Sequence, residues 1–214
     1  MARPSRKNMD ADTPTARDQL LDATGALMTE QRSIEISLSE IAERSGLNSA
    51  LVKYYFGSKN GLLVALLRKV LGPRMAELQP LASADMPANE KLRIHINGVV
   101  NTYFKYPYVN RLMHYLLTDA GQEYGKIIAE EFARPLVETQ TAILAEGQQA
   151  GLFRHTDPLI FYFHLVGACD FLFFGRATLD HVFGVPEVTQ DLKRRYVEHL
   201  YQTLTQGLAP TQGE

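Results

Sequence analysis

The fold is decided by the stretch SLSEIAERSGLNSALVKYYFGSKNGL, which spans residues 37–62. It contains two short helical segments, LSEIAERS and SALVKYYF, which are separated by Gly46. Ser37 and Glu40 have the spacing of a capping box and therefore start the first segment. Gly46 ends it, because glycine tolerates the positive φ that a sharp turn needs. Two helices joined in this way are typical of a helix-turn-helix, whose second helix enters the major groove of DNA.

The packing demands of a helix-turn-helix are also met. Ala42 supplies a small side chain where the two helices would cross. Apolar side chains on both helices would hold them together, namely Ile41, Leu47, Val52 and Tyr55. Two ordinary short core helices are the alternative, but the combination of these spacings favours the helix-turn-helix.

Helical patterns continue on both sides of this stretch. Thr15 can cap a first helix that ends at Gln31, and Ser58 a longer one from Lys59 to about Gln79. Residues 33–38 alternate like a short strand but have no partner strand, so we expect a linker. Residues 80–90 predict a loop. Further helices are expected at about 88–105, 107–119, 122–150, 157–180 and 187–207. Pro107 and Pro158 are placed at first helical positions, with Asp157 as the cap in front of Pro158.

The composition indicates a globular protein of one or two domains. The chain has 214 residues, of which 45% are hydrophobic and 21% charged. A single cysteine, Cys169, excludes an internal disulfide and fits a reducing cytoplasm. The longest apolar run, residues 159–174, is interrupted by His164 and Asp170 and is shorter than the ~20 residues of a membrane span. No signal peptide is evident. We therefore expect a soluble cytoplasmic protein with no membrane partner.

The charge is distributed unevenly along the chain. Residues 1–74 carry 11 Lys and Arg against 8 Asp and Glu, whereas the remainder carries 11 against 16. A basic first third on an acidic body indicates that only the first third approaches a polyanion. The excess is modest, and by itself it is compatible with chance.

Catalytic and metal-binding motifs are missing from the sequence. It contains no HExxH, CxxC, phosphate-binding glycine loop or G-x-S-x-G. The six histidines form no pair at the spacing of metal ligands. An all-helical enzyme is therefore the weaker alternative, and we expect no catalytic residues, metal or cofactor.

Residues 37–62 closely resemble the DNA-binding signature of TetR-type bacterial transcriptional regulators. The segment LLDATGALM resembles the opening helix of that family, so the motif-level resemblance covers about residues 15–70. The remainder is similar in helical layout and in the run from Gly151 to Pro158. Lys53, Ser49, Asn60 and the pair Gln31-Arg32 depart from the usual residues, so the operator preference of relatives does not transfer.

This resemblance implies an all-α fold with two domains. The predicted organisation is an arm at 1–13, a three-helix helix-turn-helix domain at 14–72, a larger helical effector-binding and dimerisation domain at 73–208, and a tail at 209–214. We expect both the arm and the tail to be disordered.

Residues in and beside the second short helix are the candidates for DNA contacts. Tyr54 can donate its hydroxyl to a phosphate, and Lys53 can reach a phosphate or a guanine. Lys59 lies in the first turn of the next helix, whose N-terminus attracts phosphate; the resemblance implies phosphate contacts for Tyr54 and Lys59. Base contacts are expected from Asn48, Ser49 and Ala50. Further phosphate contacts are expected from Ser37 and Arg44. Arg44 is also compatible with a solvated surface charge. Tyr55 and Phe56 are expected to face inward.

The resemblance implies that the last two long helices form a four-helix bundle with those of a second subunit. Residues 157–180 carry a helical stripe that fits this interface: Ile160, Phe163, Gly167, Phe171 and Phe174. An ordinary buried helix is the alternative. Asp170, in the same segment, is expected to pair with Arg176 or His164.

The resemblance also implies an effector pocket among the middle helices, lined by polar groups on apolar stretches. The polar candidates are Asn101, Arg111, His114, Tyr115 and His164. The apolar and aromatic candidates are Tyr103, Phe104, Phe132 and Tyr162. For each polar residue, a surface or satisfied core position is the alternative.

These features predict a homodimeric repressor that leaves its DNA operator when a small apolar or amphipathic molecule binds the body. The expected partners are operator DNA, a second copy of the chain and an effector of unknown identity. The alternatives are a transcriptional activator of the same architecture, or a helical protein-interaction module with a vestigial helix-turn-helix.

Overall fold

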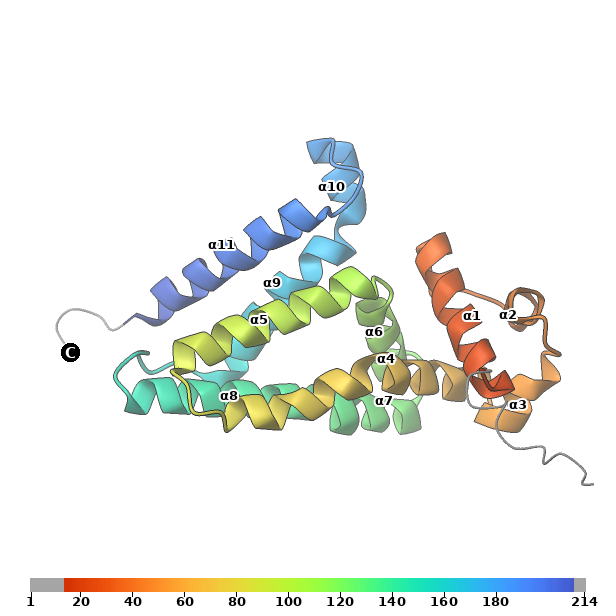
Figure 1. Ribbon diagram of the computed structural model, residues 1–214, viewed down its shortest axis with the longest axis horizontal. Helices are drawn as coiled ribbons and strands as arrows, with labels where there is room; N and C mark the ends of the chain where they lie inside the picture. Colours follow the sequence, from red (N-terminus) through yellow and green to blue (C-terminus); the bar gives the residue numbers. More distant parts are fainter. Residues whose placement is uncertain (1–13, 210–214) are drawn as a thin grey trace, which may run out of the picture.

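The computed structural model describes residues 14–209, which form helices joined by short loops (Figure 1). No strand occurs within this range, so the predicted all-α class is confirmed. The helices are α1 (Ala16–Gln31), α2 (Leu38–Ser45), α3 (Ala50–Phe56), α4 (Lys59–Ala82), α5 (Ala88–Lys105), α6 (Val109–Thr118), α7 (Gln122–Ile128), the π-helical segment η1 (Ala129–Ala133), α8 (Arg134–Gln149), α9 (Pro158–Phe174), α10 (Arg176–Phe183) and α11 (Gln190–Leu208). The predicted arm and all of the predicted tail except Ala209 lie outside the described residues.

Helices α1, α2 and α3 and the start of α4 form a small head at one end of the molecule (Figure 1). The capping box is present, because the Ser37 hydroxyl accepts from the Glu40 N–H and the Glu40 carboxylate accepts from the Ser37 N–H. Gly46 ends α2 with a φ of 69°, the left-handed conformation that favours glycine. Ile41 and Val52 are buried between the helices, and residues 33–37 form a loop, as predicted.

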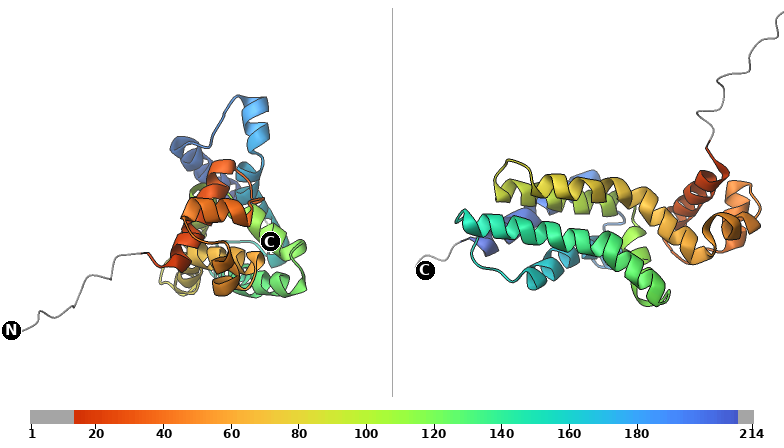
Figure 2. Two further views of the ribbon diagram at one scale, coloured as in Figure 1. Left: turned by 90° about the vertical axis from the view of Figure 1, so that its right-hand side faces the viewer. Right: turned by 90° about the horizontal axis from the view of Figure 1, so that it is seen from below.

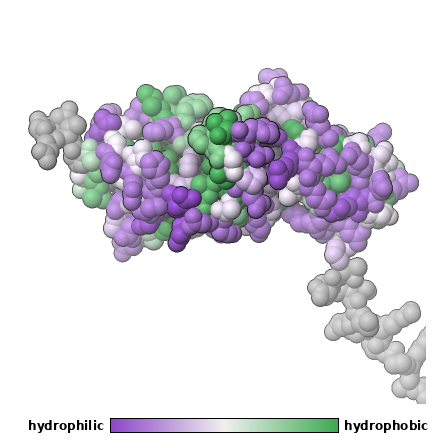
Figure 3. All heavy atoms as spheres, turned by 90° about the horizontal axis from the view of Figure 1, so that it is seen from above, coloured by the Kyte–Doolittle hydropathy of each residue, from purple (hydrophilic) through white to green (hydrophobic). Residues whose placement is uncertain are grey.

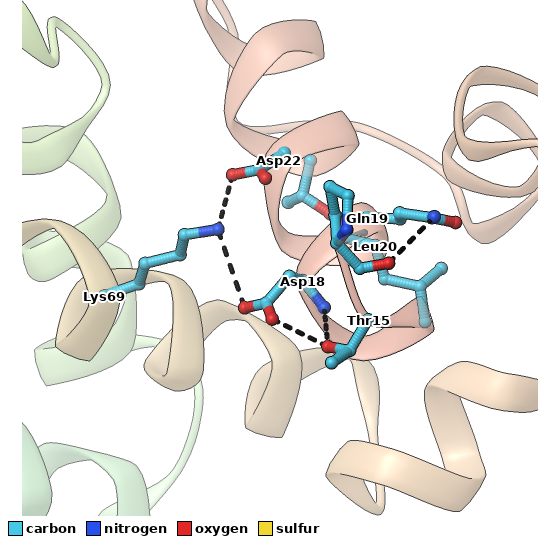
Figure 4. A network of polar contacts seen from close by, with 8 residues as sticks. Thr15, Asp18, Gln19, Leu20, Asp22 and Lys69 are labelled. Atoms are coloured by element: carbon cyan, nitrogen blue, oxygen red, sulfur yellow. Dashed lines mark hydrogen bonds and ion pairs between the residues drawn. The ribbon is translucent and has the colours of Figure 1, made fainter. Parts of the chain in front are cut away.

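Helix α1 is tied to α4 by a polar network (Figure 4). The Lys69 ammonium lies 2.6 Å from a carboxylate oxygen of Asp22 and 3.7 Å from one of Asp18. Thr15 caps α1 as predicted, with its hydroxyl accepting from the Asp18 N–H. Exposed ion pairs of this kind contribute little stability each, on the order of 0–1 kcal/mol. Their effect here is to orient α1 on the helix that leads into the body.

Helix α4 runs from the head into the body and lies beside α8 there (Figure 2). It continues through Pro73 and Pro80 to Ala82, so it is slightly longer than predicted and the following loop is confined to 83–87. The predicted domain boundary at 72/73 falls inside this continuous helix. The division into 14–72 and 73–208 therefore stays a prediction.

The body differs from the predicted layout at three points. The predicted helix at 122–150 contains the π-helical segment η1. The predicted helix at 157–180 is divided into α9 and α10, which bend by 60° at Gly175. The assignment of Pro107 to a first helical position is wrong, because α6 begins at Val109. Pro158 does start α9, and Asp157 caps it.

The core of the body is formed mainly by α5, α6, α8 and α9. Its buried side chains include Leu92, Leu112, Phe132 and Leu165. Cys169 is fully buried among them, and burial raises the pKa of its thiol to about 12, with Asp170 adding to the effect. It therefore acts as a small core residue, as the sequence indicated.

Among the described residues, no single helix has the length and apolar character to cross a bilayer; α9 and α10 meet that requirement only as a bent pair.

Candidate DNA-binding surface and effector-binding body

The N-terminal end of α3 presents three exposed residues. The Asn48 side-chain oxygen accepts a hydrogen bond of 2.8 Å from the Ala50 N–H and so begins the helix. Ser49 makes no capping hydrogen bond. Asn48, Ser49 and Ala50 are all exposed, which leaves the Ser49 hydroxyl and the Asn48 amide protons available at the end of a recognition helix that reads bases.

Lys53, Tyr54 and Lys59 extend this surface toward α4. Tyr54 is 78% exposed, Lys53 is exposed and Lys59 is half-buried in the first turn of α4. Within residues 14–209, none of these three side chains has an ion pair or a hydrogen bond. Two free cations and a free phenol beside a helix N-terminus favour contact with phosphate groups.

The neighbouring aromatic residues divide differently from the prediction. Phe56 packs against the head, and the Arg17 guanidinium lies 5.2 Å from its ring centre. Tyr55 remains 39% exposed, so its predicted inward orientation is wrong. Its ring meets the Tyr54 ring edge-on, with centroids 4.9 Å apart, and it therefore lies along the surface of α3. The sequence analysis did not identify the contact between Arg17 and Phe56. The position of Arg17 in the first turn of α1 was the available signal for it.

Ser37 and Arg44 both have partners inside the head. The hydrogen bonds from the Ser37 hydroxyl and backbone to Glu40, together with that from Gln31, hold the pKa of Glu40 at about 2. The Ser37 hydroxyl is thus engaged with both the backbone N–H and the carboxylate of Glu40, and it must turn from that carboxylate to meet a phosphate. Arg44 forms an exposed ion pair with Glu30, so it must leave that carboxylate to reach a phosphate.

The predicted effector residues lie in several different environments. Phe132 and Tyr103 are core residues; burial raises the pKa of Tyr103, and its ring lies 6.0 Å from that of Phe173. Tyr162 is half-buried, and His114 and His164 are exposed. None of these five lines the groove between α5 and α11 or the small cavity between the head and the body.

A groove of about 1200 Å³ lies between α5 and α11, and Asn101 is one of the predicted residues in its wall. The Asn101 side-chain oxygen accepts a hydrogen bond of 2.7 Å from the Lys193 ammonium. That ammonium also lies 4.8 Å from the ring centre of Phe104 and has no carboxylate partner among the described residues. Lys193 was not predicted as a candidate effector residue, because the resemblance assigned its helix to the subunit interface.

Tyr115 and Arg111 lie instead at the junction between the head and the body. The Tyr115 hydroxyl donates to the Asn60 side chain at 3.3 Å, and Arg111 donates to the Arg32 carbonyl at 3.2 Å. The Tyr124 hydroxyl lies 2.8 Å from that of Ser58. Helices α6 and α7 thus contact the start of α4 and the end of α1, which connects the body to the DNA-binding elements.

The stripe predicted on α9 is exposed. Phe163 is 68% exposed, and Gly167, Phe171 and Phe174 are exposed on the same helix. Val182 and Phe183 continue the apolar surface on α10, and hydrophobic side chains gather over the middle of the molecule where α10 stands (Figure 3). An ordinary buried helix does not fit this exposure, and an uncovered apolar surface of this kind marks an interaction site.

Asp170 is partnered by the Asn110 amide, not by Arg176 or His164, so that expectation is wrong. The reason is that α6 packs against this face of α9. Burial raises the pKa of Asp170, while the Asn110 hydrogen bond acts in the opposite direction. Among residues 14–209, no three His, Cys, Asp or Glu side chains are grouped so that they could hold a metal ion.

A three-helix head with an exposed recognition helix, joined through a long helix to an all-helical body, defines a helix-turn-helix DNA-binding regulator. The chain belongs to the TetR family of bacterial transcriptional regulators. Residues 20–66 match the family described as bacterial regulatory proteins, tetR family. Residues 85–214 match the tetracyclin repressor-like C-terminal domain.

Individual relatives are similar in sequence to parts of this chain. The HTH-type transcriptional regulator BetI of Rhizobium meliloti is 34% identical over 92 residues, which are 43% of this chain and 43% of the relative. BetI of Serratia proteamaculans is 26% identical over 156 residues, 64% of this chain and 77% of the relative. For the Rhizobium relative, the match therefore spans less than two thirds of its length.

Solved structures share the whole fold. FadR from Bacillus subtilis, solved in complex with stearoyl-CoA, superimposes with a TM-score of 0.69 at 20% identity, covering 89% of this chain and 98% of that one. A TetR/AcrR regulator from Thermobifida fusca gives a TM-score of 0.66 at 21% identity, covering 89% and 97%. At these identities the likeness establishes the fold alone.

Proposed function

We propose that this regulator is a homodimeric repressor that leaves its operator when a small apolar or amphipathic molecule binds the body. The observation that carries the DNA-binding part is the surface formed by Lys53, Tyr54 and Lys59. Lys53 and Tyr54 are exposed and Lys59 is half-buried beside the recognition helix, and none of the three has an ion pair or hydrogen bond within residues 14–209. A vestigial helix-turn-helix would have no need to keep three such groups together.

The dimer is proposed to form through the exposed face of α9. Phe163, Gly167, Phe171 and Phe174 recur at helical spacing and leave a large apolar area open to water. Covering that area with the same face of a second subunit removes it from water, and Gly167 permits a close approach of the two helices. A two-fold dimer also provides two recognition helices for two half-sites.

The effector is proposed to bind the groove between α5 and α11. Lys193 and Asn101 supply a polar end, and Phe104 and Val197 lie beside it as apolar contacts. This arrangement suits an amphipathic molecule with a negatively charged or strongly polar head group. The stearoyl-CoA bound by FadR is a molecule of that general kind, which supports the proposal without identifying the ligand.

Release from DNA requires that the ligand bind one arrangement of the two heads better than the other. The contacts at the junction offer a route for this preference. Tyr115 with Asn60, and Tyr124 with Ser58, hold α6 and α7 against the start of α4, directly after the recognition helix. A shift of α5 and α6 on ligand binding would therefore move the heads. Such a repressor acts in the cytoplasm, where its operator is.

The test is a titration of the purified protein against DNA from immediately upstream of its own gene, at low and moderate salt, with a scrambled fragment as control. We expect preferential binding that survives moderate salt, because base contacts add to the phosphate contacts. A Tyr54→Phe variant should bind the same fragment more weakly, since it lacks the hydroxyl that meets a phosphate. Binding equal to the scrambled control and lost with salt would contradict sequence-specific recognition of this fragment.

A further inference from the structure

Three arginines meet where the head approaches the body. Arg32 follows the C-terminal end of α1, Arg111 lies near the start of α6, and Arg176 begins α10 after the bend at Gly175. Figure 1 shows the end of α1 facing this bend, at the opposite end of α1 from α3. All three arginines line one small cavity of about 30 Å³, together with the apolar side chains of Met28 and Phe173.

These guanidinium groups lack a carboxylate partner. None of the three forms an ion pair with a residue in the 14–209 range. Asp170 is near Arg111 but is bonded to the Asn110 amide. Glu187 acts on Arg176 only from beyond ion-pair distance. The Nε atom of Arg176 is buried and has no hydrogen-bond acceptor. A buried donor without an acceptor is costly, so the site is incomplete as it stands.

The three positive charges also oppose one another. Burial lowers the pKa of Arg176, and the charges of Arg32 and Arg111 lower it further. Arg111 has a partial partner in the Phe174 ring, whose centre is 5.4 Å away. An anion among the three groups would offset their mutual repulsion. It would also accept a hydrogen bond from the unpartnered Nε–H group of Arg176.

The backbone at Arg32 provides an independent observation. Arg32 has a φ of 53°, and it is the one non-glycine residue between 14 and 209 with a positive φ. Such a conformation is strained for a residue with a side chain and is tolerated where the surroundings enforce it. Here the Arg32 carbonyl accepts from the Arg111 guanidinium, which holds the Arg111 side chain beside the backbone of Arg32.

We propose that Arg32, Arg111 and Arg176 form a binding site for a phosphate group between the head and the body. Guanidinium groups match the geometry of phosphate oxygens and hold them with charge-assisted hydrogen bonds. The cavity admits one end of a phosphate, with the remaining oxygens toward solvent and the exposed side chains of Arg32 and Arg111. The phosphate is either the free ion or the terminal group of a small organic molecule.

A phosphate bound here would connect a head residue, Arg32, to two body residues. It would therefore fix the orientation of the head and change the operator affinity of the dimer. This second consequence rests on the proposed function, whereas phosphate binding itself does not.

The site is tested by calorimetric titration of the full chain with inorganic phosphate at constant ionic strength and without DNA. We expect saturable binding that weakens at least about tenfold in Arg176→Gln and in Arg32→Gly. Arg32→Gly is informative because glycine adopts a φ of 53° without strain, so that variant keeps the fold. The matched control is Arg134→Gln, which removes one exposed arginine of α8 that pairs with Glu130.

Unsaturable binding, or equal weakening in the Arg134→Gln control, would overturn the site. A parallel titration with a nucleoside monophosphate separates the two sources: tighter binding than inorganic phosphate supports an organic phosphate, and equal binding supports the free ion. Operator titrations with and without phosphate then test the coupling. An unchanged operator affinity in the phosphate-saturated protein would overturn the coupling alone, whereas no operator binding by any variant would contradict the proposed function and leave the phosphate result intact.

Discussion

Tyr54, Tyr55 and Phe56 follow one another in the sequence but occupy three different environments. Successive residues of a helix point about 100° apart, so three neighbours face three clearly different directions. Phe56 reaches the core of the head, Tyr55 lies along the surface and Tyr54 points into solvent. The residue type alone therefore does not assign a role, and the position around the helix does.

Replacing Lys59 by alanine should weaken DNA binding about equally on all sequences. The Lys59 side chain has no ion pair within the described residues, so the loss concerns a phosphate contact and not the stability of the head. The slope of log affinity against log salt should flatten by ~1 to 2 units for a dimer. Lys126→Ala on α7 is the matched control, because it removes the same charge from an exposed position outside the helices α1 to α4. An unchanged slope in Lys59→Ala would remove this residue from the phosphate contacts.

Substitution of Ser49 should change the preferred sequence more than the affinity for DNA in general. Its hydroxyl is exposed at the start of α3 and makes no capping hydrogen bond. A base contact at this position is worth about 1–3 kcal/mol of discrimination. Selection from a random DNA library by the wild type and by Ser49→Ala measures the effect. Identical preference profiles would refute a readout role for Ser49.

His95 makes the stability of the body dependent on pH. Burial lowers its pKa to about 4, and its ring nitrogen lies 3.0 Å from the Gln140 amide nitrogen, which requires a neutral imidazole. In the unfolded chain the pKa of His95 is near 6.5, so as the pH falls the imidazole is protonated in the unfolded state before it is protonated in the folded state. Stability should therefore decrease between pH ~6.5 and ~4, by about 2 kcal/mol at pH 5.

Urea unfolding at pH 7.5 and pH 5 measures this loss. In His95→Gln the difference between the two pH values should shrink by about the same 2 kcal/mol, since glutamine does not titrate. The exposed His155 provides the control, and His155→Gln should keep the wild-type pH dependence. Equal pH dependence in wild type and His95→Gln would contradict a buried neutral histidine.

At the scale of elements, the sequence predicted those helices whose ends carry their own signals. Thr15, Ser37, Ser58 and Asp157 each cap the helix that they were expected to begin. The bend at Gly175 was not predicted, because the apolar pattern continues across it. The π-helical segment η1 was not predicted either, since a shift in backbone hydrogen bonding leaves little trace in side-chain periodicity.

Phe163→Glu should disrupt the dimer that α9 is proposed to form. The substitution places one carboxylate from each subunit at a two-fold interface, where desolvation and like charges both oppose association. We expect the dimer dissociation constant to rise at least about tenfold, as measured by analytical ultracentrifugation, with little change in helical content because Phe163 is exposed in the subunit. Leu152→Glu, outside α9 in the loop before it, is the control. A Phe163→Glu protein that stays dimeric would place the interface elsewhere.

At the scale of the molecule, the fold and exposed residues of the head could be predicted from the sequence, whereas the organisation of the body could not. The helix-turn-helix is built from residues close together in sequence, so local spacing and the family resemblance predicted Asn48, Ser49, Lys53 and Tyr54 in and beside the second short helix, and all four are exposed there. An effector site combines helices that are far apart in sequence. Asn101 of α5 meets Lys193 of α11 across the chain, and Arg111 and Tyr115 reach the head. A local sequence pattern does not indicate contacts between residues that are far apart in the chain.

The symmetry of the proposed dimer predicts the form of its operator. A two-fold axis between two α9 helices relates the two recognition helices, so the preferred DNA should be an inverted repeat. Its half-sites should be separated by one helical turn, about 34–36 Å, or by a multiple of that distance. Selection from a random library, followed by titration of the consensus and of an isolated half-site, measures this. The half-site should bind at least about a hundredfold more weakly, because it engages one head and loses the phosphate contacts of the other. A consensus without symmetry, or a half-site bound as tightly as the full repeat, would show that the two heads do not act together.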